Sequence, residues 1–255
     1  MIFESHAHYD DKRFDIDRHE LLKSLPSKGI EYLLNVGADV KSSYECVKLA
    51  KEYDYIYAAV GVHPHDVKDM KEKDLETLIG LASYKKVVAI GEIGLDYYYE
   101  ISPKEVQKLW FREQIELAKE LDMPIIVHSR DASKDCYDII KETDAKEAGG
   151  VIHCYSGSVE MAREYTKMGF YIGVGGVVTF KNANKLKNVV KETPMNKILI
   201  ETDCPYLAPV PNRGKRNDST NLKYIAEEIG KIKNISLEDV IKYTNENAKR
   251  LFRVS

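Results

Sequence analysis

The segment VVAIGEIG, residues 87–94, decides the fold that the sequence predicts. It is a near-continuous apolar run with one carboxylate, Glu92, and such a run is typical of a parallel strand buried on both faces. Residues 103–122 then predict a helix, because Ser102 can cap it and Pro103 fits its first turn. The side chains at helical spacing are Val106, Leu109, Trp110, Gln114, Leu117 and Leu121. A strand followed by such a helix predicts a βα unit.

The same alternation runs along the whole chain. Strands are predicted near Ile2–Ser5, Tyr32–Val36, Ile56–Val62, Val87–Ile93, Pro124–Val127, Gly150–Ile152, Phe170–Val174 and Ile198–Glu201. Helices are predicted near residues 15–28, 41–53, 71–84, 103–122, 132–142, 158–168, 182–192 and 220–252. This pattern predicts an α/β fold, a (β/α)8 TIM barrel formed by one domain over residues 1–255. An open doubly wound sheet is the alternative, although no G-x-G-x-x-G motif follows the first strand.

The charge balance excludes one class of function. The chain carries 38 lysine and arginine residues against 41 aspartate and glutamate residues, for a net charge of −3. A strongly basic nucleic-acid coat protein is excluded, because its affinity comes from excess positive charge over a wide surface. An enzyme with one local basic patch is not excluded.

Nothing in the sequence predicts export or membrane insertion. MIFESH, residues 1–6, has neither the basic nor the apolar region of a secretory signal. No apolar run approaches the ~18 residues of a membrane span. The 4 cysteines lie far apart without a C-x-x-C pair, which is typical of reduced thiols. We therefore expect a cytoplasmic protein that binds no membrane, and no obligate protein partner is indicated.

Most of the 7 histidines follow predicted strands. They are His6, His8, His63, His65, His128 and His153. Glu92 ends the fourth predicted strand, and Asp203 follows the eighth. Taken singly, a histidine at such a position is more often a surface residue than a ligand. Because the carboxyl ends of parallel strands gather at one rim of a barrel, the joint pattern predicts a metal site there, with its catalytic face on that rim.

The spacing of His6 and His8 suits metal binding, because residues i and i+2 of a strand share a face. Imidazole and carboxylate ligands suit Zn, Mn, Fe or Ni, and carboxylates also allow Mg. The candidate set exceeds the four ligands of a single zinc ion. It therefore predicts two divalent ions that share a carboxylate, and Glu92 is placed to be that bridge. Such a pair can generate a hydroxide and stabilise both the attacking and the leaving oxygen.

Seven short motifs, in this order, resemble the TatD-type metal-dependent hydrolases, a branch of the amidohydrolase-like barrels. They are SHAH (5–8), GVHPHD (61–66), GEIGLDY (91–97), HSRDA (128–132), HCYSG (153–157), ETDCPYL (201–207) and RGKRN (213–217). Together they span essentially the whole chain. One departure is Glu4, where the family commonly has aspartate before the H-x-H pair, and this changes the support of the ligands rather than the ligands themselves.

The resemblance implies a ligand set for the two ions. One ion would be held by His6, His8, Glu92 and Asp203. The second ion would be held by Glu92, His128 and His153. The resemblance further implies that Asp203 is the general base that orients or deprotonates the bridging water.

The resemblance also implies an activity, the hydrolysis of DNA from its 3′ end through a metal-bridged hydroxide. The expected substrate is a single-stranded DNA end. An amide or lactone hydrolase is one alternative, but such binuclear enzymes often bridge their metals with a carboxylated lysine, whereas this chain offers Glu92. A noncatalytic metal-dependent binding protein or scaffold is another alternative. The presence of every expected ligand argues against it, because a scaffold needs none of them.

Substrate binding needs local positive charge. His63 looks like the residue that family members place near the substrate phosphate, and His65 is a further candidate. Arg130 follows the expected ligand His128 and can meet a phosphate. Positive residues also lie in the proline-rich segment 205–217, at Arg213, Lys215 and Arg216. Three consecutive tyrosines, residues 97–99, can stack on bases or pack within a loop.

Overall fold

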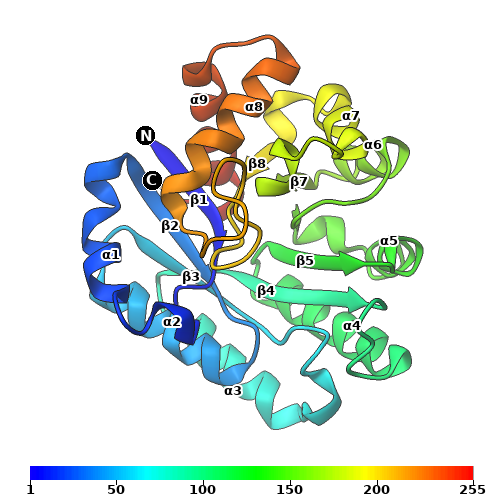
Figure 1. The fold of residues 1–255 in the computed structure, drawn as a ribbon. Helices are drawn as coiled ribbons and strands as arrows, with labels where there is room; N and C mark the ends of the chain where they lie inside the picture. Colours follow the sequence, from blue (N-terminus) through cyan, green and yellow to red (C-terminus); the bar gives the residue numbers. More distant parts are fainter. Residues whose placement is uncertain (255) are drawn as a thin grey trace. The chain divides into compact units, whose positions relative to one another are not determined.

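The computed structural model describes residues 1–254 and contains the predicted alternation of strands and helices (Figure 1). The strands are β1 (Ile2–Ala7), β2 (Ile30–Val36), β3 (Ile56–Val60), β4 (Val87–Asp96), β5 (Ile125–Arg130), β6 (Gly150–Ile152), β7 (Tyr171–Val174) and β8 (Ile198–Ile200). The α-helices are α1 (Arg18–Ser24), α2 (Val40–Glu52), α3 (Glu72–Ala82), α4 (Lys104–Glu120), α5 (Ser133–Glu142), α6 (Val159–Lys167), α7 (Asn184–Glu192), α8 (Leu222–Lys233) and α9 (Leu237–Phe252).

Seven short 3₁₀ helices lie in the connections of the described chain. They are η1 (Lys12–Phe14), η2 (Pro26–Lys28), η3 (Val67–Asp69), η4 (Ala145–Glu147), η5 (Gly176–Thr179), η6 (Met195–Lys197) and η7 (Ser219–Asn221). Three strands run past their expected ends, since β1 continues to Ala7, β4 to Asp96 and β5 to Arg130. The expected site residues within the longer strands include His6, His128 and Arg130.

All eight strands belong to one sheet, in the order of the chain from β1 to β8. Contacts group the residues into two compact units. The first unit contains residues 1–35, 154–166 and 171 onward, and the second contains residues 36–153 and 167–170. The expectation that residues 1–255 form one domain stays a prediction.

In the first unit, β1 pairs in parallel with β2, and β7 pairs in parallel with β8. An isolated parallel bridge joins Ala7 to Cys204, just after β8. Two backbone hydrogen bonds flank it: the amide of His8 donates to the carbonyl of Cys204 at 2.8 Å, and the amide of Asp203 donates to the carbonyl of His6 at 3.0 Å. The ends of the first and last strands are therefore held together.

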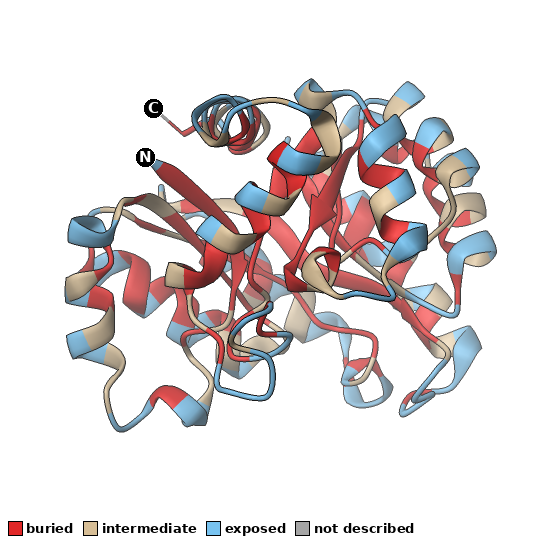
Figure 2. Ribbon diagram, turned by 45° about the horizontal axis from the view of Figure 1, so that its top comes forward, coloured by how far each residue is buried: buried red, intermediate tan, exposed pale blue. Residues whose placement is uncertain are grey.

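In the second unit, β3, β4, β5 and β6 pair in parallel in that order. In Figure 1, β4 and β5 lie side by side. Their pairing continues to Asp96 opposite Arg130, which keeps the ends of both strands in register. The strands are almost wholly buried, whereas the helices alternate buried and exposed turns (Figure 2). This burial on both faces confirms the interpretation of the apolar run at residues 87–94.

Two predicted helices are wrong as single elements. Residues 15–28 contain two elements, α1 and then η2. The helix breaks before Pro26, the first residue of η2, because proline cannot continue the hydrogen-bond ladder of α1. Residues 220–252 contain η7, α8 and α9. Asn234 ends α8 in a left-handed conformation, and the side chain of Ser236 caps α9 by accepting a hydrogen bond from the amide of Asp239.

The expected cap of α4 is also wrong. Pro103 is the N-cap residue, and its backbone is not helical. The hydroxyl of Ser102 instead donates to the carbonyl of His65 at 2.8 Å. The buried face of α4 also differs from the expected one, because Leu109 is 52% exposed. The residues that α4 buries are Gln107, Phe111, Gln114, Ile115, Leu117 and Ala118.

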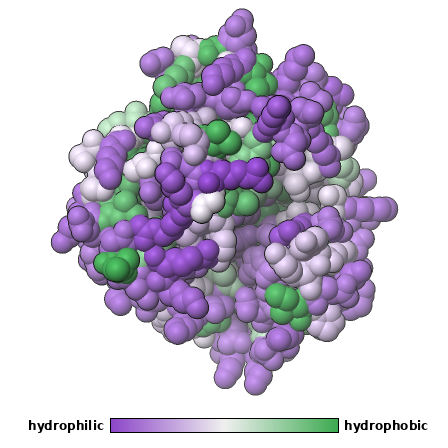
Figure 3. Space-filling model, in the orientation of Figure 1, coloured by the Kyte–Doolittle hydropathy of each residue, from purple (hydrophilic) through white to green (hydrophobic). Residues whose placement is uncertain are grey.

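The face drawn in Figure 3 is mostly hydrophilic, and hydrophobic residues form small, separate groups on it. Within residues 1–254, no helix combines the length and the apolar character that crossing a bilayer requires.

Gly94 is required by the packing of β4 on β5. Its φ is +138°, and an added Cβ would lie 2.1 Å from the carbonyl oxygen of His128. We expect Gly94→Ala to lower the free energy of unfolding by about 2–4 kcal/mol, from steric overlap and from the strained backbone. Urea unfolding followed by circular dichroism measures this change. Gly80→Ala is the matched control, because Gly80 lies on the exposed side of α3 with nothing within 4 Å of its Cβ position. An equal loss in both variants would contradict the assignment.

Candidate metal centre

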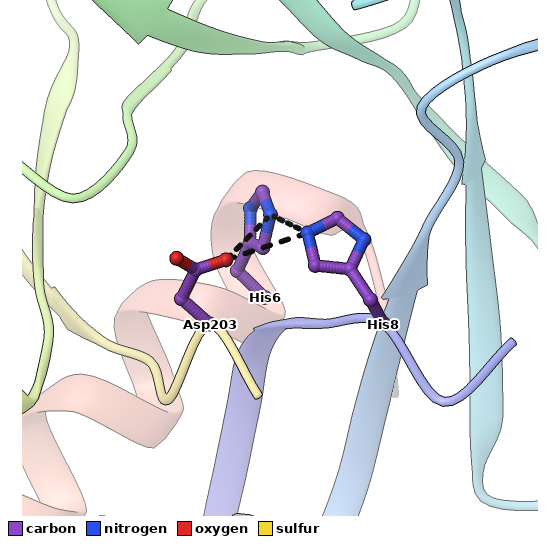
Figure 4. Close-up of side chains that lie close together, drawn as sticks. All are labelled: His6, His8 and Asp203. Atoms are coloured by element: carbon purple, nitrogen blue, oxygen red, sulfur yellow. Dashed lines mark hydrogen bonds and ion pairs between the residues drawn. The ribbon is translucent and has the colours of Figure 1, made fainter. Parts of the chain in front are cut away.

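The first cluster of candidate ligands, His6, His8 and Asp203, lies in the first unit (Figure 4). The Nε2 atoms of the two histidines are 3.0 Å apart. Oδ1 of Asp203 lies 3.9 Å from Nε2 of His6 and 3.4 Å from Nε2 of His8. His6 is buried and Asp203 is partly open to solvent. The expected convergence of the H-x-H pair is therefore observed, and it includes Asp203.

Glu4 holds the backbone beneath this cluster. Its carboxyl accepts hydrogen bonds from the amide of Thr202 at 2.9 Å, from the hydroxyl of Thr202 at 2.7 Å and from the amide of His6 at 3.3 Å. Complete burial raises the pKa of Glu4 to about 8, although these hydrogen bonds oppose the shift. The residue that departs from the family pattern thus ties the end of β1 to the end of β8, immediately before Asp203.

The second cluster lies in the second unit and is centred on one carboxylate oxygen. Oε1 of Glu92 lies 2.8 Å from Nδ1 of His128, 3.8 Å from Nε2 of His63 and 3.7 Å from Nε2 of His153. Glu92 and His153 are each 4% exposed. The three histidines come from the ends of three different strands, as the sequence predicted. The partners of Glu92 thus include three imidazoles, which is the environment of a metal ligand.

Asp96 is the residue of this cluster that sequence reasoning missed. Its side chain is 1% exposed, and Oδ2 lies 3.0 Å from Nε2 of His65 and 3.1 Å from Nε2 of His128. Its Oδ1 accepts hydrogen bonds from the amides of Tyr98 and Tyr99. The two ring nitrogens of His128 thus face two carboxylates, Nε2 toward Asp96 and Nδ1 toward Glu92 at 2.8 Å. The contact with Asp96 fixes the orientation of the His128 ring.

The charges of this cluster follow from its burial and contacts. Burial lowers the pKa of His128, but hydrogen bonds to Asp96 and Glu92 outweigh it and raise the pKa overall. Burial would raise the pKa of Asp96, yet the hydrogen bonds from His128 and from the amide of Tyr99 lower it. Burial and the neighbouring His128 hold the pKa of His63 well below its usual value. Burial thus favours the neutral form of His63, the form of imidazole that can ligate a metal.

Two buried glutamines of α4 fix the backbone of this cluster. Oε1 of Gln114 accepts a hydrogen bond from the amide of Val62 at 2.8 Å, and Nε2 donates to the carbonyl of Val62 at 3.0 Å. Oε1 of Gln107 likewise accepts a hydrogen bond from the amide of Asp96 at 2.8 Å, and its Nε2 donates to the carbonyl of Asp96 at 3.1 Å. A polar residue on the apolar face of a helix was the available sequence signal, because a buried amide must be hydrogen-bonded.

The expected substrate-binding residues lie around the second cluster. The ring centres of His63 and His128 are 4.5 Å apart. His63 could therefore also contact an ion bound at Glu92. His65 contacts Asp96 and the ring of Tyr99. Arg130 is exposed, and its guanidinium lies over the ring of Tyr98.

The basic segment after β8 is only partly available for substrate. Arg216 forms a bidentate ion pair with Asp17, which lies before α1. The guanidinium of Arg213 lies 4.5 Å from the ring centre of Phe180. Arg213 and Lys215 are exposed. Arg216 therefore fixes a loop, and the other two remain candidates for contact with an anion.

Each cluster fits a divalent cation by the chemistry of its donors. His6, His8 and Asp203 bring two imidazole nitrogens and one carboxylate oxygen within 4.8 Å of one another, and so do His63, Glu92 and His128. The Nε2 atoms of His6 and His8 are 3.0 Å apart, close enough for one cation to contact both nitrogens. Nitrogen and carboxylate donors of this kind bind Mn, Fe, Ni or Zn.

The sequence model of the family described as "TatD related DNase" matches residues 3–253. The chain belongs to this family. It is 49% identical over 255 residues to the "Uncharacterized metal-dependent hydrolase YabD" of Bacillus subtilis, with 100% of both chains covered. It is 32% identical over 259 residues to the "3'-5' ssDNA/RNA exonuclease TatD" of Escherichia fergusonii, again with 100% of both covered.

A solved structure of the family matches the whole fold. YJJV, a TatD homolog from Escherichia coli K12, superposes with a TM-score of 0.93 at 28% identity, covering 100% of this chain and 98% of that chain. The predicted (β/α)8 barrel and the predicted TatD family membership are both confirmed. At the level that these relatives share, the chain is a metal-dependent hydrolase.

Proposed function

We propose that this TatD family member is a phosphodiesterase that removes nucleotides from the 3′ end of single-stranded DNA with the help of two divalent ions. The observation that carries the proposal is the pair of ligand clusters, His6–His8–Asp203 and the Glu92 cluster of imidazoles. The relative named "3'-5' ssDNA/RNA exonuclease TatD", at 32% identity over its full length, supports the substrate class.

The residues of the chain have separate roles in this proposal. His6, His8 and Asp203 hold one ion, and Glu92 with His128 and His153 holds the other. When bound, divalent ions lower the pKa of water and offset the negative charge that grows on the phosphoryl oxygens. Mg, Mn, Zn, Ni and Fe are all compatible with these donors.

Asp203 is the proposed general base. Its side chain is 16% exposed, so water reaches it, whereas the side chain of Glu92 is only 5% exposed. A carboxylate at the mouth of the first cluster can accept the proton of an attacking water molecule. His63 and His65 lie beside Glu92 and Asp96, and they are proposed to contact the substrate phosphate.

A direct assay tests the proposed activity. A 5′-labelled single-stranded DNA, an RNA of the same sequence and a panel of lactones and amides are incubated with the protein and Mg²⁺ or Mn²⁺, with and without EDTA. We expect a ladder of DNA shortened from its 3′ end, and we expect EDTA to abolish it. Hydrolysis of lactones or amides without any DNA cleavage would overturn the proposal in favour of the amidohydrolase alternative.

Asp96 is proposed to position His128, so Asp96→Asn is expected to weaken the second cluster without removing a ligand. We expect metal affinity and kcat/KM to fall by about 10–100-fold, which is typical of the carboxylate behind a ligating histidine. Calorimetric titration with Mn²⁺ and DNA hydrolysis measure the two quantities. Asp54→Asn is the control, because Asp54 is exposed in the turn before β3. Unchanged Mn²⁺ affinity in Asp96→Asn would contradict the positioning role.

A further inference from the structure

We propose that Tyr98, Tyr99 and Arg130 form a stacking platform for the bases of a single-stranded nucleic acid. The inference rests on the proposed function and names how that substrate is held. It assigns a binding role to three exposed side chains that ligate no ion and take no part in the reaction.

The platform consists of two exposed tyrosine rings and one arginine side chain in contact. Tyr98 is 57% exposed and Tyr99 is 56% exposed, and their ring centres are 4.8 Å apart in an edge-to-face arrangement. The guanidinium carbon of Arg130 lies 3.9 Å from the ring centre of Tyr98 and 4.7 Å from that of Tyr99. Within residues 1–254, neither tyrosine hydroxyl makes a hydrogen bond. Two large aromatic rings are thus presented to solvent rather than packed.

The charge of Arg130 suits a phosphate backbone. In the described part of the chain, no carboxylate lies within ion-pair distance of its guanidinium. Arginine stays protonated at every physiological pH, and its planar group stacks on aromatic rings while its edge still donates hydrogen bonds. Arg130 therefore combines a stacking surface with one uncompensated positive charge.

The platform is anchored to the second cluster by short covalent and hydrogen-bonded links. Oδ1 of Asp96 accepts hydrogen bonds from the amides of Tyr98 and Tyr99 at 3.0 Å and 2.9 Å. The other oxygen of that carboxylate contacts His65 and His128, and the ring of Tyr99 lies edge-on to His65 at 5.5 Å. A base bound on the platform is held beside the cluster that would receive its phosphate.

Tyr97 shows what a structural tyrosine in the same run looks like. Its hydroxyl donates to Asp135 at 2.7 Å, and the amine of Lys104 lies over its ring at 4.7 Å. Its hydroxyl is hydrogen-bonded and its side chain is half-buried, so it is not part of the platform. Within residues 97–99, the exposed tyrosines are therefore Tyr98 and Tyr99.

The chemistry of the platform favours bases of any sequence. Each nucleobase has a π-face that stacks on tyrosine or on a guanidinium plane, and a stack of this kind tolerates all four bases. A paired duplex buries those faces between its own base pairs. The platform therefore selects unpaired bases, without reading sequence.

Binding without turnover tests the platform. The probe is a fluorescein-labelled oligothymidylate of about ten nucleotides, compared by fluorescence anisotropy in EDTA with an abasic oligomer of the same length. We expect Tyr98→Leu/Tyr99→Leu to weaken oligothymidylate binding at least about tenfold and to leave abasic binding within about twofold. We expect Arg130→Gln to weaken the binding of both probes.

The matched control is Tyr243→Leu, since Tyr243 is an exposed tyrosine of α9, 44% exposed. Far-ultraviolet circular dichroism checks that each variant is folded. Oligothymidylate binding unchanged in the double tyrosine variant, or an equal loss for both probes, would overturn the platform. DNA hydrolysis by the wild-type protein is measured separately. If the protein cleaves DNA but the double tyrosine variant binds oligothymidylate normally, the proposed function stands and the platform fails. If binding depends on the bases but no DNA is cleaved, the platform stands and the proposed function fails.

Discussion

Glu92→Gln is expected to lower kcat/KM for single-stranded DNA at least about a thousandfold. The amide keeps the shape of the side chain but removes the charge that faces three imidazoles in the second cluster. The family resemblance assigns Glu92 to both ions, so its loss is expected to cost more than the loss of a residue behind a ligand, which typically costs about 10–100-fold. Initial rates with 3′-labelled DNA and Mn²⁺ measure the change.

The control for this variant is Glu120→Gln, an exposed glutamate at the end of α4. Circular dichroism is expected to be the same for both variants, because neither substitution changes side-chain volume. Turnover of Glu92→Gln within a few-fold of wild type, in a folded protein, would contradict the assignment of Glu92 to the metal centre.

Asp203→Asn is expected to lower kcat by about 10²–10⁴-fold, the usual contribution of a general acid or base. Asparagine can still direct an oxygen at His6 and His8, but it cannot take a proton from water. We therefore expect DNA binding to change much less than kcat. Steady-state kinetics on DNA, together with anisotropy titrations in EDTA, separate these two effects.

Asp144→Asn is the matched control for Asp203→Asn. Both aspartates have a left-handed backbone, with φ of 53° for Asp144 and 56° for Asp203, and asparagine tolerates that conformation well. Asp144 is an exposed residue before η4. If Asp203→Asn lost DNA affinity and kcat in equal proportion, Asp203 would be acting in binding rather than as a base.

The strand ends were predictable from the sequence because they carry two coincident signals. Short apolar runs marked the strands, and a histidine or a carboxylate followed most of them. The parallel arrangement then required those residues to gather at strand ends, and His6, His8 and Asp203 do lie together. Glu92 and His128 likewise lie together in the second unit.

The residues behind the ligands were not predictable in the same way. Asp96 lies beyond the predicted strand end at Ile93, and its role depends on a contact with His128, 32 positions away. Gln114 belonged to the predicted buried face of its helix, but the spacing does not show what its amide binds. Gln107 lay outside that face, which included the exposed Leu109, because residue spacing alone does not show which stripe is buried. The break between α8 and α9 follows from the left-handed Asn234, a local conformation that apolar periodicity does not register.

The number of metal ions bound per chain is the most direct test of the proposed two-ion centre. The protein is stripped with EDTA, reloaded with Mn²⁺, dialysed and analysed by inductively coupled plasma mass spectrometry, alongside the His6→Ala/His8→Ala variant. We expect about two ions per wild-type chain and about one in the variant, because one of the two ligand clusters has lost both imidazoles. A wild-type protein that retains no stoichiometric divalent ion, or a variant that retains as many ions as the wild type, would contradict the two-ion centre.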